Sequence, residues 1–138
     1  MCQQLGSQVP IIKPQLAFFG DEWASVESLT SVAREGGSLL LADAKRGDIG
    51  STAEAYADRI LGPDGPCDAV TLNPYLGGDS VEPWIERAAA NGKGLFLLVK
   101  TSNPGSADLQ DLKIQDSDTL CEHVARLVDR LGADHVGE

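Results

Sequence analysis

The chain has 138 residues, 42% of them hydrophobic, which suits one packed domain and leaves too little for two. Its formal net charge of −10 argues against binding to nucleic acid or anionic membranes through bulk charge. An anionic substrate would need a local cluster of Lys and Arg side chains.

Residues 1–8 are polar and unpatterned, so we expect a tail there, followed by a single domain over residues 9–138. In that domain, short apolar runs alternate with amphipathic stretches. The runs are continuously apolar, which is typical of strands covered on both faces, as in parallel sheets. In chain order we predict a strand at 9–12, a helix at about 21–35, a strand at 38–42, a helix at about 51–61, a strand at 69–72, a helix at about 79–91, a strand at 95–99 and a helix at about 117–131.

Signals for helix boundaries accompany these stretches. Ser51 and Glu54 have the spacing of a capping box, and Asp79 is expected to cap the third helix. Helix ends are expected where a left-handed residue or a proline stops propagation, at Gly36-Gly37, Gly62-Pro63 and Asn91-Gly92.

The predicted strands recur about every 30 residues, the length of one βα unit. This repeat fits a (β/α)8 barrel or an open doubly wound sheet. No Gly-x-Gly-x-x-Gly turn follows the first strand, which weakens the dinucleotide-binding form of the open sheet. A whole barrel needs about 250 residues. We therefore predict an α/β fold, a partial TIM (β/α)8 barrel of about four βα units, with the start of another strand at residues 133–138.

Charged side chains follow the first two predicted strands: Lys13 after the first, and Asp43, Lys45 and Asp48 after the second. In a βα barrel the C-terminal strand ends face one mouth, where active sites lie. Asp43 and Lys45 are two apart, so regular strand geometry would point both to the same side. We therefore expect Lys45 to be flanked by two carboxylates, with Lys13 available from the adjacent strand.

Such an array has a clear chemical use. A lysine held between carboxylates stays protonated, and it can stabilise a developing carbanion and then donate a proton to it. A carboxylate beside a substrate carboxylate would repel it and favour loss of carbon dioxide. The alternative interpretation is a solvated loop, because Asp-x-Lys-x-x-Asp is a weak motif by itself.

The segment Asp43–Thr52 resembles the signature of orotidine 5'-phosphate decarboxylases, in particular the longer bacterial subgroup found in actinobacteria. Three further blocks agree in order and spacing: Lys13–Phe19, Asn73–Asp79 and Lys100–Gln110. The resemblance implies a carboxy-lyase that converts orotidine 5'-phosphate to UMP in de novo pyrimidine biosynthesis. It also implies a homodimer that needs no metal or organic cofactor.

The resemblance assigns roles to individual residues. Lys45 protonates C6 of the pyrimidine after carbon dioxide leaves, Asp43 lies near the substrate carboxylate, and Lys13 links the ribose to the charged network. Asp48 reaches across the dimer interface into the partner's site. The residues assigned to substrate binding are Ser102, which reads the pyrimidine edge, and Thr52, Ile49 and Asn73.

Two parts of the family pattern are expected outside this sequence. They are a first strand with a ribose-contacting Asp before Lys13, and phosphate-binding loops after Glu138. Because binding of a remote phosphate contributes to catalysis, such a fragment is expected to have impaired activity. Two alternatives stay open: a related magnesium-dependent sugar-phosphate decarboxylase or aldolase, and an inactive folded remnant.

The cysteines bear on location. Cys2, Cys67 and Cys121 are odd in number and widely spaced, without a Cys-x-x-Cys pair, which favours reduced thiols in a cytoplasmic protein. The first twenty residues lack a basic stretch followed by an apolar core, so no signal peptide is expected, and no apolar run is long enough to cross a bilayer.

Overall fold

The computed structural model describes residues 8–20, 23–114 and 118–135. Contacts divide the chain into two compact units, Met1–Phe96 and Leu97–Glu138. The expected tail at residues 1–8 lies outside the described residues except for Gln8. One domain over residues 9–138 therefore stays a prediction.

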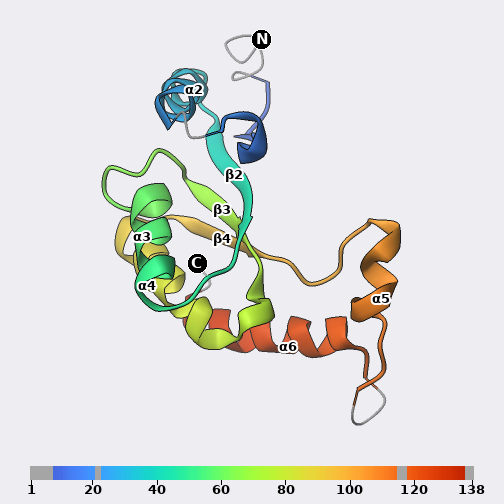
Figure 1. Cartoon of the computed structure of the whole chain (residues 1–138). Helices are drawn as coiled ribbons and strands as arrows, with labels where there is room; N and C mark the ends of the chain where they lie inside the picture. The colour runs from blue at the N-terminus through green and yellow to red at the C-terminus, as the bar shows by residue number, and fades with distance from the viewer. Residues whose placement is uncertain (1–7, 21–22, 115–117, 136–138) are drawn as a thin grey trace. The chain divides into compact units, whose positions relative to one another are not determined.

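A parallel sheet with covering helices forms the first unit. The strands follow the order β1-β2-β3-β4, and β2 pairs in parallel with both β1 and β3. Figure 1 shows α3 beside α4, and β2, β3 and β4 next to one another. This alternation confirms the predicted α/β fold. In chain order the elements are β1 (Ile11–Ile12), the 3-10 helix η1 (Leu16–Phe18), α2 (Trp23–Glu35), β2 (Leu39–Arg46), α3 (Gly50–Leu61), β3 (Ala69–Leu72), the 3-10 helices η2 (Pro74–Leu76) and η3 (Gly78–Ser80), α4 (Glu82–Asn91) and β4 (Gly94–Leu97).

The core lies where β2 and β3 pack against the helices. Leu40, Ala42 and Val70 are fully buried there, and Trp84 of α4 is buried with them. Burial of each large apolar side chain contributes about 1.5–3 kcal/mol. Strand side chains alternate between faces, so Leu39 lies on the opposite face, and it is 54% exposed. The same alternation places Asp43 on the face of Leu39, away from the helices.

The strand bounds differ from the predicted ones. β1 is limited to Ile11–Ile12, and β4 ends at Leu97 rather than residue 99. β2 continues past the predicted end at Ala42, because Arg46 pairs with Leu72 beyond a shift in register. The apolar run ends at Ala42, but backbone pairing does not require apolar side chains.

Two predicted helix caps, at Ser51 and Asp79, are wrong. α3 begins at Gly50 with Ile49 as its N-cap residue and no side-chain cap, so Ser51 lies inside the first turn. Asp79 lies in η3, and α4 begins only at Glu82. Gly92 is left-handed, with φ 62°, as its predicted role at a helix end requires. The predicted ends are confirmed, because α2, α3 and α4 stop at Glu35, Leu61 and Asn91.

The second unit contains η4 (Pro104–Ser106), α5 (Ala107–Gln110) and α6 (Leu120–Gly132). α6 has a capping box made by Thr119 and Glu122. The predicted fifth strand is wrong for residues 133–135, which form a turn with the His135 N–H donating to the Gly132 carbonyl at 2.8 Å. Residues 136–138 lie outside the described part. No helix among the described residues is long and apolar enough to span a membrane.

Candidate active site

Asp43 is the centre of a charged cluster at the end of β2. Its carboxylate accepts a hydrogen bond from Lys13 Nζ at Oδ2, at 3.2 Å, and one from Lys45 Nζ at Oδ1. Thr71 Oγ1 of β3 also lies 3.2 Å from Oδ1. Asp43 is 7% exposed, whereas the side chains of both lysines are about half exposed. A nearly buried carboxylate thus carries one ammonium group on each oxygen.

Pairing of β1 with β2 brings Lys13 to this place. Ile12 is the register partner of Leu40, and the same offset continues to an isolated bridge between Gln15 and Asp43. The Asp43 N–H donates to the Pro14 carbonyl at 2.9 Å. Because the C-terminal ends of parallel strands meet at one edge, two residues distant in sequence come into contact.

Lys45 reaches Asp43 through an irregular backbone. Its φ is 49°, and no other non-glycine residue in the described ranges has a positive φ. The register of β2 on β3 shifts between Ala42 and Arg46. The expectation of regular strand geometry from Asp43 to Lys45 is therefore wrong, although the two side chains do meet. A bulge of this kind changes the direction of a side chain and often lies next to an active site.

The electrostatics of the cluster favour a charged Asp43. The hydrogen bond from Lys45 lowers the pKa of this carboxyl below its ordinary value, and hydrogen bonds from Lys13 and Thr71 act in the same direction. Burial opposes them without reversing the shift. Asp43 is therefore ionised at neutral pH and orients both ammonium groups.

Asp48 departs from the predicted arrangement. Its Oδ1 accepts the N–H of Ile49 at 2.9 Å, and within the described residues it forms no ion pair with Lys45. In this chain the cluster is a carboxylate between two lysines rather than a lysine between two carboxylates. The reason is local, because Asp48 lies in the turn after β2 and its side chain bonds to the start of α3. Thr52 lies exposed in the first turn of that helix.

Asn73 supports this turn from the next strand. Its N–H donates to the Arg46 carbonyl at 2.7 Å, and its Oδ1 accepts from the Tyr75 N–H at 3.0 Å at the start of η2. A Cβ atom on Gly47 would lie 3.0 Å from the Asn73 carbonyl oxygen. Gly47 therefore permits a close approach between the two strand ends. The substrate contact predicted for Asn73 stays a prediction.

Ser102 belongs to the second unit, where it is exposed. The neighbouring Thr101 is held by Gln110, whose Oε1 accepts the Thr101 N–H at 2.8 Å. The Thr101 hydroxyl donates to Asn103 Oδ1 at 2.7 Å. These bonds order the segment around Ser102. Its contact with a pyrimidine stays a prediction.

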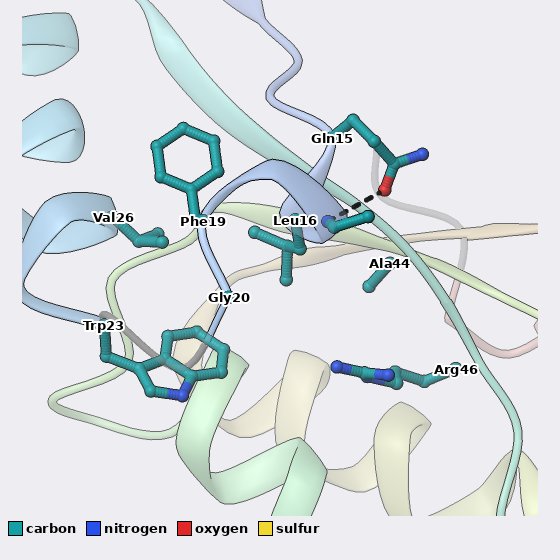
Figure 2. Close-up of a pocket in the computed structure, with 9 residues that line it drawn as sticks. Gln15, Leu16, Phe19, Gly20, Trp23, Val26, Ala44 and Arg46 are labelled. Atoms are coloured by element: carbon teal, nitrogen blue, oxygen red, sulfur yellow. Dashed lines mark hydrogen bonds between the residues drawn. The ribbon is translucent and has the colours of Figure 1, made fainter.

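A pocket of about 230 Å³ lies between η1, the start of α2 and the end of β2 (Figure 2). Leu16, Trp23 and Arg46 surround it, and the Gln15 side chain accepts the Ala17 N–H beside it at 3.4 Å. The nine lining residues include none of the three charged side chains that meet at Asp43. The pocket therefore adjoins the backbone of the charged cluster at Ala44 without being lined by its charged side chains.

Thr71 is the residue of the cluster that the sequence patterns did not single out. It stands inside an apolar run and resembles an ordinary strand residue. The sequence does carry one signal for Thr71, which is a polar residue between two apolar ones, Val70 and Leu72. Both of these neighbours are buried. For metal ligands, the described ranges hold no group of three or more His, Cys, Asp or Glu side chains that could bind an ion.

Comparison with known sequences gives a consistent match. The sequence profile of the orotidine 5'-phosphate decarboxylase / HUMPS family matches residues 1–135. An orotidine 5'-phosphate decarboxylase of Rhodopirellula baltica is 45% identical over 144 residues, covering 94% of this chain and 47% of the relative. One of Salinispora tropica is 44% identical over 137 residues, covering 95% of this chain and 49% of the relative.

Solved structures agree. A Streptomyces avermitilis protein classed provisionally as an orotidine 5'-phosphate decarboxylase has a TM-score of 0.83 at 42% identity, with 97% of this chain and 48% of that chain covered. The Leishmania donovani OMP decarboxylase has a TM-score of 0.76 at 39% identity, with 90% and 50% covered. The chain thus spans about half the length of the relatives it matches, and its fold is part of a TIM barrel, as predicted.

Proposed function

The chain belongs to the orotidine 5'-phosphate decarboxylase / HUMPS family, and on that basis we propose that it carries the catalytic centre of an orotidine 5'-phosphate decarboxylase. The reaction converts orotidine 5'-phosphate to UMP in pyrimidine biosynthesis. The observation that carries this proposal is the array of Lys13, Asp43 and Lys45 at neighbouring strand ends.

The array fits the chemistry of decarboxylation. As the bond between C6 and the carboxylate breaks, its electron pair stays on C6 and carbon dioxide leaves. The Lys45 ammonium stabilises this developing negative charge and then transfers a proton from Nζ to C6. Asp43 holds Nζ in place before the reaction, and its negative charge disfavours the bound substrate carboxylate relative to neutral carbon dioxide. Solvent returns the proton to the Lys45 amine after product leaves.

Lys13 has a second role in this proposal. Its Nζ neutralises the other Asp43 oxygen and is half exposed, so the ammonium group can also contact a ribose hydroxyl. The pyrimidine edge is read by Ser102, and Asn73, Ile49 and Thr52 complete the substrate contacts. No metal or organic cofactor takes part in the proposed reaction.

The test is the loss of orotidine 5'-phosphate absorbance with the purified 138-residue chain. We expect turnover that falls at least 1,000-fold in Lys45→Ala, on the order expected when a proton donor that also stabilises charge is removed. Lys113→Ala is the matched control, because it removes a lysine outside the cluster, and it is expected to retain the rate. A rate that survives Lys45→Ala contradicts the mechanism.

Two further results would favour the alternatives. Turnover that requires added magnesium, and that acts on sugar phosphates, would favour the related metal-dependent enzyme. A folded chain without turnover on either substrate would favour the inactive remnant.

We also propose a cytoplasmic homodimer in which Asp48 completes the partner's site. Asp48 forms no ion pair with the Lys45 of its own chain among the described residues, and the adjacent Ile49 is 56% exposed. Mixing inactive Asp48→Asn and Lys45→Ala chains tests this arrangement. In each mixed dimer one site is intact, so activity returns to at most about one quarter of the wild-type value. If Asp48 acts within its own chain, the mixture stays inactive.

A further inference from the structure

The Thr71 hydroxyl is bonded in all the directions that a hydroxyl allows. Its Oγ1 accepts the N–H of Ala44 at 2.9 Å and that of Lys45 at 3.0 Å. Its hydrogen has two acceptors within reach, the Ala42 carbonyl at 3.5 Å and Asp43 Oδ1 at 3.2 Å, and the shorter contact is with Asp43, which can only accept when ionised. One hydroxyl has one hydrogen to donate and two lone pairs. Thr71 therefore binds the backbone of the bulge and its charged carboxylate at the same time.

The hydrogen bonds from Ala44 and Lys45 to Thr71 lie where the register of β2 on β3 is irregular. β2 pairs with β3 in regular register up to Ala42, and pairing resumes where Arg46 meets Leu72. Between those points neither Ala44 nor Lys45 has a register partner on β3. The Ala44 amide is partly buried, and leaving such a group without a partner is costly, so an acceptor on the facing strand is needed here. The Thr71 side chain supplies it.

The conformation that Thr71 supports is an unfavourable one. Lys45 has φ 49°, a region that residues with a Cβ atom rarely occupy. Strained backbone of this kind persists only where neighbouring groups hold it, and it is concentrated at functional sites. If the backbone at Lys45 were extended, its side chain would project from the strand in a different direction and would not approach Asp43 in the same way.

We propose that Thr71 is a positioning residue that locks the β2 bulge and so holds the Lys45 ammonium against Asp43. Its catalytic consequence rests on the proposed function, because it assumes that Lys45 Nζ delivers the proton. The structural part stands without any activity. Thr71 does not touch the reacting atoms in this proposal and acts through Asp43 and Lys45.

The test compares Thr71→Val with Thr71→Ser in the full chain. Valine keeps the shape and removes the hydroxyl, whereas serine keeps the hydroxyl. In Thr71→Val we expect the Ala44 and Lys45 amides to exchange with solvent at least tenfold faster, measured by NMR against the amides of α3. We also expect the Asp43 pKa, followed by its carboxyl carbon shift, to move up toward its ordinary value. Thr71→Ser is expected to match the wild type in both readouts.

In the decarboxylation assay we expect Thr71→Val to lower kcat about 10- to 100-fold with KM nearly unchanged, as for a small misplacement of a reacting group. Unchanged exchange rates and an unchanged Asp43 pKa in a folded Thr71→Val chain would overturn the inference. If that variant does not fold, Thr71→Cys is compared with Thr71→Ser by the same two NMR readouts. If the two variants differ in the NMR readouts as expected but the wild-type chain shows no turnover, the proposed function is contradicted. The positioning role of Thr71 then remains intact.

Discussion

Lys13 Nζ and Asp43 Oδ2 are 3.2 Å apart although the two residues are separated by 30 positions in the chain. The contact joins β1, which is only two residues long, to the centre of the charged cluster. A strand of only two residues thus brings the side chain that follows it into the charged cluster.

Replacing Lys13 tests whether this contact serves structure or chemistry. Lys13 is half exposed, so Lys13→Met is expected to lower the free energy of unfolding by less than about 1 kcal/mol. The same change removes one of the hydrogen bonds that lower the Asp43 pKa, so that pKa is expected to rise. Urea denaturation and NMR titration measure the two effects. A large loss of stability with an unchanged Asp43 pKa would indicate a mainly structural role.

The lowered pKa of Asp43 predicts a dependence of stability on acid. Its folded-state pKa is below the unfolded-state value of 3.8, so the ionised form is bound more tightly in the folded chain. This contribution is complete above the unfolded-state pKa and is lost as the pH falls through the folded-state pKa. We expect the stability difference between wild type and Asp43→Asn to shrink below pH 3.8. Denaturation curves at neutral and acidic pH measure it, and a constant difference would contradict the ionised assignment.

Much of the fold could be predicted from the sequence because burial leaves a pattern. The runs at Leu40 and Val70 are apolar on both faces, and both residues are fully buried in a parallel sheet. The meeting of Lys13 with Asp43 follows from one rule, that the ends of parallel strands share an edge. These features depend on composition along the chain, which a sequence displays directly.

The remaining features depend on register, which composition does not reveal. The shift of β2 on β3 decides that the Thr71 hydroxyl meets the amides of Ala44 and Lys45. The same irregular backbone gives Lys45 its positive φ. The failed cap at Ser51 has a similar cause, because the N-cap position is Ile49, two residues earlier, and the Ser51 hydroxyl lies inside the first turn.

Gly47 is predicted to be intolerant of a side chain. A Cβ atom there would lie 3.0 Å from the Asn73 carbonyl oxygen, so the ends of β2 and β3 must separate slightly. We expect Gly47→Ala to lower the free energy of unfolding by about 1–3 kcal/mol, as for other overpacked sites. Gly132→Ala is the matched control, since a Cβ atom there meets nothing within 4 Å at the end of α6. Equal stabilities of the two variants in thermal denaturation would contradict the close approach.

We predict that Lys93 has a structural role and stabilises the loop after α3. Its Nζ donates to the carbonyls of Gly62 and Gly65, at 3.0 and 2.8 Å, and so ties the turn before β4 to the loop after α3. Burial lowers the pKa of its ammonium group, which shows that these bonds must offset a desolvation cost. Removing the donor leaves two carbonyls of buried glycines without that partner.

We therefore expect Lys93→Met to lower the free energy of unfolding by about 1–3 kcal/mol, the range for lost hydrogen bonds to a charged group. Lys100→Met is the matched control, because its ion pair with Asp111 joins two exposed residues and such pairs contribute about 0–1 kcal/mol. Urea denaturation of both variants measures the difference. Because Lys93 is remote from Asp43 in the hydrogen-bond network, the Asp43 pKa should stay at its wild-type value in the folded Lys93→Met chain. If Lys93→Met is no less stable than Lys100→Met, Lys93 does not hold the loop.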